Sequence, residues 1–267
     1  MAAIKPFTIL YEDDSIIAVN KASGIAVTGE RWDEDAPRLD LLLKQELTLR
    51  QVCSTAELYI IHRIDKDTSG LVVFAKDRDT HQRLSVAFEK RQVAKTYIAV
   101  VHGRPFWPDG KTSCDLPLVP DGNKKHLTII DNSRGKTSRT GFTLLFSAGN
   151  YSIVEACPQT GRTHQIRVHL SALGFPIVCD PLYGKHTRSG KKEGVYLSSF
   201  KRNWRGNENE ERPLLDRLGL HALRITLNEK VFEAPLSRDI SALIKQMEKH
   251  RIVLHQTKTD TNHPLTP

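Results

Sequence analysis

The sequence predicts an α+β domain built on a largely antiparallel or mixed β-sheet that is flanked by helices. Short runs of β-branched and aromatic residues outnumber helical patterns, and turn residues typical of hairpins separate two pairs of these runs. A doubly wound parallel sheet requires a regular alternation of strand and long helix, which this sequence lacks. With 39% hydrophobic and 26% charged residues among 267, the composition is that of an ordinary globular protein.

The first expected hairpin joins strands at 8–11 and 16–19 through a polar turn, Glu-Asp-Asp-Ser. The second joins strands at 142–146 and 151–156 through the turn Ser-Ala-Gly-Asn. Further apolar runs of strand length predict single strands at 58–61, 71–75, 97–101, 175–179 and 221–227.

Two helices are expected from apolar residues that repeat at helical spacing. The first covers 79–92, with Asp79 or Thr80 as its N-cap. The second covers 163–173 and ends at Gly174, a residue typical of helix C-termini. One domain over 1–255 is expected, followed by a polar tail over 256–267.

The sequence predicts neither a membrane span nor a secretory leader, because no run approaches the roughly 20 apolar residues that cross a bilayer. The cytoplasm is the expected compartment. A metal site is not expected, because His164 and His169 are five positions apart, a spacing that does not bring two ligands together on a helix. The cysteines lack CxxC spacing and are expected to be reduced and buried: Cys53, Cys114, Cys157 and Cys179.

The formal net charge of +8 suggests a polyanionic partner, and the distribution of charge is more informative than the total. Seven basic residues and one acidic residue lie between Lys185 and Arg205, interleaved with three aromatic residues. Five basic residues and one acidic residue lie between Gly122 and Arg139. Basic loops with aromatic residues suit a phosphate backbone and exposed bases, although two solvated surface loops would have the same composition.

The segment 59–70 is the most informative part of the sequence. An apolar strand leads directly to His62, Arg63 and Asp65, and a polar turn then leads to a second apolar strand. Charged groups at the end of a rigid strand are typical of functional loops, although a hairpin in which an aspartate caps the turn gives the same pattern. Because Arg63 and Lys66 flank Asp65, the ionised form is favoured, which suits a nucleophile or an ion-stabilising group.

A second group of polar residues lies at the start of the helix expected near 163. Arg162, His164 and Gln165 gather at its N-terminus, where backbone N–H groups attract anions, and Arg167 follows one turn later. A surface helix end would also account for these arginines. Tyr97 begins an apolar strand two positions after a lysine, and a tyrosine there is usually a core residue.

Together these segments resemble the RluA-type family of RNA pseudouridine synthases. The family motif H-R-[LI]-D-x-x-T-S-G is matched at 62–70, and G-R-T-H-Q-I-R-x-H at 161–169. Shorter family patterns match in the same order at 20–24, 95–97, 176–184 and 220–222. The matches run from about residue 8 to 236. Ala22 replaces a usual proline and Cys179 a usual glycine, and neither change removes a candidate catalytic side chain.

The resemblance implies the pseudouridine synthase catalytic fold, with a central RNA-binding cleft and an isomerase acting on ribosomal or transfer RNA. The product contains the atoms of the substrate, so no cofactor or metal is expected. The resemblance implies Asp65 as the essential carboxylate, Arg167 as its ion-pair partner, and Tyr97 as a ring that stacks on the base and is a candidate general base. Arg63 is implied to fill the place of a flipped-out uridine.

The remaining residues expected to contact RNA are His62, Arg162, His164, Gln165, Lys191, Lys192, Lys201 and Arg202. The S4 domain of many relatives is not expected, because the catalytic pattern begins near residue 8, so the catalytic domain itself is expected to hold RNA as a monomer. Nucleophilic attack by the aspartate and a glycal route both remain open.

Two other functions remain open from the residues. The run 65–68 also resembles the D-x-D-x-T motif of haloacid dehalogenase-type phosphotransferases, which need Mg²⁺ and a parallel α/β sheet. A non-catalytic RNA-binding or RNA-chaperone protein on the same fold is the second alternative.

Overall fold

The computed structural model describes residues 5–29, 37–50, 57–122, 127–184, 193–200, 211–227 and 229–251. The main sheet contains β1 (Phe7–Glu12), β2 (Ile16–Lys21), β3 (Tyr59–Ile60), β4 (Ser69–Ala75), β5 (Val93–His102), β6 (Lys111–Cys114), β9 (Thr140–Ala148), β10 (Tyr151–Pro158), β11 (Leu220–Leu227) and β12 (Lys230–Glu233). A separate pair consists of β7 (Leu118–Pro120) and β8 (Thr128–Ile130). The helices are α1 (Leu39–Leu49), α2 (Arg78–Glu89), α3 (Gln165–Ala172) and α4 (Arg238–Lys249), with short 3₁₀ turns at Pro108–Gly110 and Leu197–Ser199.

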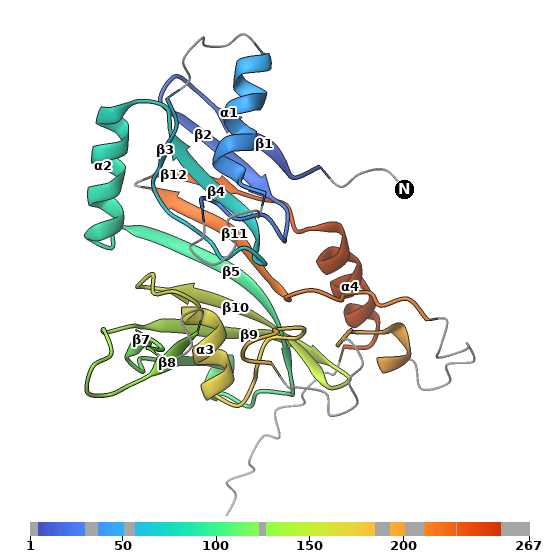
Figure 1. The fold of residues 1–267 in the computed structure, drawn as a ribbon. Helices are drawn as coiled ribbons and strands as arrows, with labels where there is room; N and C mark the ends of the chain where they lie inside the picture. Colours follow the sequence, from blue (N-terminus) through green and yellow to red (C-terminus); the bar gives the residue numbers. More distant parts are fainter. Residues whose placement is uncertain are drawn as a thin grey trace, which may run out of the picture.

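The main sheet has the order β1-β2-β4-β11-β5-β10-β9-β6, with β12 beside β11 and β3 beside β4 (Figure 1). All pairs of named strands are antiparallel except β4 and β11, which are parallel over two residue pairs. The predicted α+β class with a largely antiparallel sheet is therefore confirmed. The parallel α/β sheet that a haloacid dehalogenase-type phosphotransferase needs is not the fold of these residues.

Strand β4 is buried on both faces, because successive side chains of a strand point in opposite directions and each side is covered by a helix. Val72 belongs to an apolar cluster with Leu43 of α1. Val73 belongs to the cluster on the opposite face, with Leu84 of α2. Strand β4 is therefore fixed between the two helices, and the loop that precedes it leads into a rigid strand.

Strand β5 runs through the centre of the sheet and connects its two halves (Figure 1). Val100 packs in a cluster with Leu243 of α4, and Val101 in the cluster on the other face with Leu170 of α3. Tyr97, earlier in β5, packs against the core under α1 and also against the core under α3. The residues around Tyr97 therefore lie where the two halves of the fold meet.

Both expected hairpins are confirmed, as β1–β2 and β9–β10. The helix expected at 79–92 is α2, which ends earlier, at Glu89. Its N-cap is Asp77, two residues before Asp79 and three before Thr80, because the Oδ1 of Asp77 accepts the hydrogen bond of the Thr80 N–H at 2.7 Å. The helix expected at 163–173 is α3.

The prediction of a strand at 175–179 is wrong, because among these residues only Ile177 forms a β-bridge, an isolated one with Val101. Helices α1 and α4 were not expected from the sequence. Among the cysteines, Cys157 is exposed, contrary to the expectation of burial, and Cys53 lies outside the described residues. The expected C-terminal tail over 256–267 also lies outside the described residues.

Gly70 shows how closely β4 and β11 approach each other at their parallel contact. Its φ is +113°, and a Cβ at this position would lie 2.2 Å from the carbonyl oxygen of Ala222. We expect Gly70→Ala to lower the free energy of unfolding by about 3 kcal/mol, since it adds a backbone clash to an unfavourable φ. Denaturation in urea measures the loss.

Gly24→Ala is the matched control. Gly24 has a φ of +84°, but a Cβ there would have no heavy atom within 4 Å. We expect a cost of only about 1–2 kcal/mol, which is the penalty of the left-handed conformation alone. Equal losses for the two variants would contradict the proposed clash at Gly70.

Within the described part of the chain, none of the helices has both the length and the apolar composition needed to cross a membrane.

Candidate active site in the central cleft

A cleft of about 1160 Å³ lies where the two halves of the sheet meet. One wall is the loop between β3 and β4, and the other includes the segment between β10 and α3 together with the first turn of α3. Side chains of β5 also line the cleft, and the ends of β7 and β8 contribute Pro120 and Thr128. The three segments singled out in the sequence therefore meet in one cavity.

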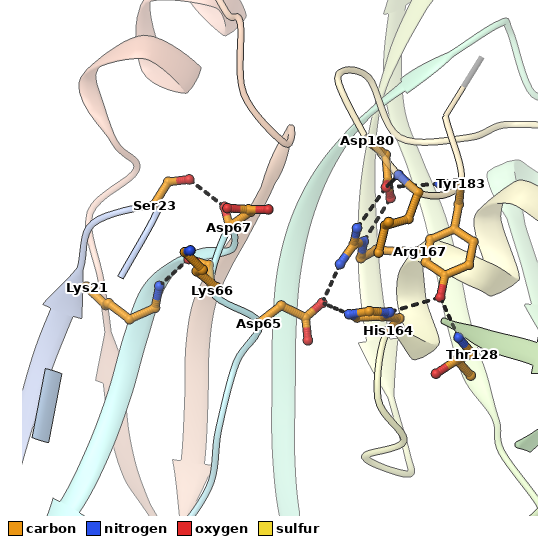
Figure 2. A network of polar contacts seen from close by, with 11 residues as sticks. Lys21, Ser23, Asp65, Lys66, Asp67, Thr128, His164, Arg167, Asp180 and Tyr183 are labelled. Atoms are coloured by element: carbon orange, nitrogen blue, oxygen red, sulfur yellow. Dashed lines mark hydrogen bonds and ion pairs between the residues drawn. The ribbon is translucent and has the colours of Figure 1, made fainter. Parts of the chain in front are cut away.

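Asp65 lies in the loop before β4, and its side chain is 24% exposed. Arg167 donates from Nη1 to Oδ2 of this carboxylate at 3.1 Å, and Nε2 of His164 lies 3.9 Å from the same oxygen (Figure 2). Oδ1 accepts no hydrogen bond from the described residues. The carboxylate is therefore held through one oxygen and leaves the other available.

Lys21 at the end of β2 supports the backbone of this loop. The lysine is only 1% exposed, and its ammonium donates to backbone carbonyl oxygens that include that of Lys66, at 2.9 Å (Figure 2). The hydroxyl of Ser23 donates to the carbonyl oxygen of Asp67 at 2.7 Å. These contacts fix the two residues that follow Asp65 and give a structural role to the family pattern at 20–24, for which the sequence suggested none.

Arg167 is 3% exposed and is shared between two aspartates. Besides Asp65, it binds Asp180 through Nε and Nη2, each at 2.8 Å, in a bidentate pair (Figure 2). Burial alone would lower the pKa of Arg167, but hydrogen bonding to Asp180 and the charges of both aspartates outweigh it and raise this pKa. The guanidinium is therefore a permanent cation facing Asp65.

Asp180 was not a candidate from the sequence, but in the structure it is the second aspartate that binds Arg167. Its side chain is fully buried, and besides Arg167 its Oδ1 accepts from the backbone N–H groups of Leu182 and Tyr183 at 2.9 and 3.1 Å. Burial would raise the pKa of Asp180, but the hydrogen bonds and charge of Arg167, joined by the backbone hydrogen bonds, lower it. Asp180 thus orients Arg167 and anchors the segment that carries Tyr183.

Two residues of this region adopt left-handed backbone conformations that disfavour side chains. His164, the N-cap of α3, has a φ of +53°, and Cys179, next to Asp180, has a φ of +55°. The second value explains why glycine is usual at position 179 in the family that the sequence resembles. Strained backbone that is retained beside paired charges is typical of functional sites.

Tyr97 lines the cleft from β5 and is partly buried. Burial, aided by the negative charge of Asp65, raises the pKa of its phenol above the usual value near 10. The phenol is therefore protonated at neutral pH, and Tyr97 presents an apolar ring face and a hydroxyl to the cleft.

His62 and Arg63 precede Asp65 and differ strongly in environment. Nε2 of His62 accepts a hydrogen bond from the Val73 N–H at 3.0 Å, and its ring stacks on Phe88 at 5.1 Å. Burial, with a contribution from the charge of Lys95, lowers the pKa of His62 to about 3. Arg63 is exposed and forms no ion pair or hydrogen bond with the described residues.

Gln165 lines the cleft, but its amide is engaged within the protein. Its Oε1 accepts from the hydroxyl of Thr160 at 2.7 Å and from the Arg162 N–H at 3.0 Å. Its Nε2 donates to the Arg139 carbonyl at 3.0 Å and to the Thr140 hydroxyl at 2.9 Å. Gln165 therefore joins the start of α3 to the region of β9.

The guanidinium of Arg162 donates from Nε to the carbonyl oxygen of Thr137 at 3.3 Å and lines the cleft. The four basic residues expected to contact RNA from the segment 185–205 lie outside the described residues: Lys191, Lys192, Lys201 and Arg202.

The sequence profile of the family described as RNA pseudouridylate synthase matches residues 15–172. A relative from Zymomonas mobilis, ribosomal large subunit pseudouridine synthase D, is 31% identical over 250 residues, which cover 91% of this chain and 73% of the relative. The protein of the same name from Borreliella burgdorferi is 34% identical, covering 73% of this chain and 60% of its own length. An uncharacterized RNA pseudouridine synthase of Zymomonas mobilis is 33% identical over 239 residues, which cover 88% of this chain and 96% of that protein.

Solved structures agree with the fold. Human RNA Pseudouridylate Synthase Domain Containing 4 aligns with a TM-score of 0.69 at 24% identity, over 90% of this chain and 92% of that chain. Human RNA Pseudouridylate Synthase Domain Containing 1 aligns with a TM-score of 0.62 at 24% identity, over 89% and 86% of the two chains. The cleft with its paired aspartate and arginine thus lies in a pseudouridine synthase fold, and the chain belongs to the RNA pseudouridylate synthase family, which consists of isomerases that act on RNA.

Proposed function

We propose that the chain isomerises a uridine of large-subunit ribosomal RNA to pseudouridine, as a cytoplasmic monomer, with residues 1–255 as the catalytic domain and Asp65 as the essential carboxylate. The observation that carries the proposal is the pairing of Asp65 with Arg167 in the cleft, which leaves Oδ1 available to a substrate. Ribosomal RNA is proposed because two of the relatives are named for it.

The reaction breaks the bond between N1 of uracil and C1′ of ribose, turns the base, and joins C5 to C1′. The proton on C5 is lost and N1 gains one, so atoms and charge balance without a cofactor. Asp65 serves this chemistry either by attacking through Oδ1 or by stabilising an oxocarbenium-like sugar beside it. Both routes require an ionised carboxylate, and the cation of Arg167 lies 3.1 Å from Oδ2 of Asp65.

The target uridine must leave its stack to reach Asp65, at a cost of a few kcal/mol. Arg63 is the residue proposed to occupy the vacated place in the RNA, and its exposed guanidinium beside the cleft, which pairs with none of the described residues, supports this role. Arg162 and His164 line the opposite wall and are proposed to contact the RNA there. The basic residues Lys191, Lys192, Lys201 and Arg202 are proposed to contact the RNA backbone.

Tyr97 is proposed to stack on the flipped base. We expect Tyr97→Phe to keep the RNA affinity within about threefold, since it retains the ring, and Tyr97→Leu to weaken binding by about 1–3 kcal/mol, since it loses the stacking surface. Filter binding with a large-subunit RNA fragment measures both. Equal affinities for the two variants would contradict stacking.

The same pair of variants tests the second role proposed for Tyr97, removal of the C5 proton. The raised pKa of the phenol disfavours the phenolate. A kcat of Tyr97→Phe within about tenfold of the unchanged protein would assign the residue to stacking alone.

Release of tritium from RNA that contains 5-³H-uridine tests the proposed function, because the C5 hydrogen leaves only when the new glycosidic bond forms there. Large-subunit ribosomal RNA is the substrate and excess EDTA is present. Release in EDTA is expected, and it would exclude the Mg²⁺-dependent phosphotransferase. Binding of the RNA without release would overturn the proposal in favour of a non-catalytic RNA-binding protein.

A further inference from the structure

His164 lies between the proposed catalytic carboxylate and a tyrosine hydroxyl. Its Nδ1 is 2.9 Å from the hydroxyl oxygen of Tyr183, and its Nε2 is 3.9 Å from Oδ2 of Asp65 (Figure 2). The side chain is 14% exposed, so solvent does little to decide which ring nitrogen carries the proton. That choice is set by its two neighbours.

The backbone of Thr128 occupies one acceptor position of the Tyr183 hydroxyl and so favours a hydrogen bond from this hydroxyl to His164. The Thr128 N–H can only donate, and it does so to the Tyr183 hydroxyl oxygen at 2.8 Å (Figure 2). The one hydrogen of that hydroxyl can then be donated to Nδ1 of His164, which lies 2.9 Å away. In that arrangement Nδ1 is an acceptor, and the proton of the neutral ring is on Nε2.

The charges around His164 agree with a neutral ring of this tautomer. Burial lowers the pKa of His164, and the cation of Arg167 adds to this, although Asp65, Asp180 and Asp67 oppose it. The other tautomer would direct an Nε2 lone pair at the carboxylate of Asp65, which is electrostatically unfavourable.

We propose that Tyr183 is a positioning residue that fixes His164 with its Nε2–H directed at Asp65; this rests on the proposed function of Asp65. Two donors, His164 and Arg167, then approach the same oxygen, Oδ2. At 3.9 Å the His164 donor is beyond hydrogen-bond distance and acts as a local dipole directed at the carboxylate. The carboxylate is thereby oriented, and Oδ1 becomes the oxygen that meets the substrate.

Tyr183→Phe is the variant that tests this role, because it keeps the ring on which Arg167 packs at 5.3 Å and the backbone N–H that binds Asp180. Tyr11→Phe is the matched control. Its hydroxyl also makes two hydrogen bonds, to Asp13 at 2.5 Å and from Lys230 at 2.6 Å, but it does not line the cleft.

Two-bond ¹H–¹⁵N spectra of protein labelled with ¹⁵N-histidine report which ring nitrogen carries the proton, and a His164→Gln variant assigns the signals. We expect an unprotonated Nδ1 and a protonated Nε2 in the unchanged protein and in Tyr11→Phe. In Tyr183→Phe we expect a mixture of the two tautomers, because Nδ1 has lost the hydroxyl that fixed it as an acceptor. A protonated Nδ1 in the unchanged protein, or an unaltered tautomer in Tyr183→Phe, would overturn the inference.

Tritium release supplies the second measurement. We expect Tyr183→Phe to lower kcat about tenfold, the effect of one lost hydrogen bond, with the KM for RNA within about twofold. An unchanged kcat despite a changed tautomer would also overturn the inference. The spectra do not depend on turnover, so a protein that fails to release tritium contradicts the proposed function while the tautomer is still measured.

Discussion

Asp65→Asn is expected to abolish isomerisation while leaving RNA affinity nearly unchanged. The amide has the shape of the carboxylate but carries no charge, so it can neither attack a carbon nor stabilise a developing cation. Loss of a residue in direct contact with the reacting atoms lowers kcat by a factor on the order of 10³ or more. Tritium release at saturating RNA measures the turnover, and filter binding measures the affinity.

The fold is expected to survive this change, because Arg167 keeps its bidentate pair with Asp180 when Asp65 is neutralised. An unchanged melting temperature therefore separates lost chemistry from lost structure. Asp79→Asn, on the exposed surface of α2, is the control and should leave turnover intact. Full activity of Asp65→Asn would remove the basis of the proposed function.

The same variant separates catalysis from binding in the cell. If Asp65→Asn restored growth to a strain that lacks this gene, RNA binding alone would be the function that matters. We expect no rescue.

Arg167→Met is expected to have the largest effect on stability among single changes in the cleft. It leaves the fully buried carboxylate of Asp180 with only backbone N–H partners. Removing one partner of a buried ion pair costs about 3–5 kcal/mol, because the other charge stays desolvated without compensation. Urea denaturation measures this loss, and tritium release is expected to be lost as well.

A second substitution separates the two roles of Arg167. In Arg167→Met/Asp180→Asn no unpaired charge is left at the buried position, so much of the lost stability should return. Activity should not return, because Asp65 still lacks the cation that pairs with it and orients it. Recovery of turnover in the double variant would show that Arg167 matters only for folding.

Arg217→Met is the matched control for stability. Arg217 also forms a bidentate pair, with Asp239 at 2.6 and 2.8 Å, but the two side chains are 20% and 34% exposed. Water compensates much of the lost interaction there, so we expect a loss of about 1 kcal/mol or less. A loss as large as that of Arg167→Met would contradict burial as the cause.

Local patterns in the sequence predicted β1 to β5, β9 to β11 and two helices, because alternation and capping residues act over a few positions, but they did not indicate the short strands β6, β7, β8 and β12. They misled at 175–179, where an apolar run forms one isolated bridge in place of a strand. Helices α1 and α4 each bury apolar residues at helical spacing, and the sequence carries this signal for both: Leu39, Leu43 and Leu47 in α1, and Ile240, Leu243 and Met247 in α4.

The sequence by itself predicted which residues carry the chemistry, since the motifs around Asp65 and Arg167 are long and specific and the short pattern at Tyr97 falls between them in the family's order. Only the tertiary structure decided how they work together. Asp65 and Arg167 are 102 positions apart, and their contact depends on the order of the strands that separate them. The same holds for Asp180 and Tyr183, whose roles come from partners that folding brings near, because hydrogen bonds and ion pairs act over a few ångströms in space and not along the chain.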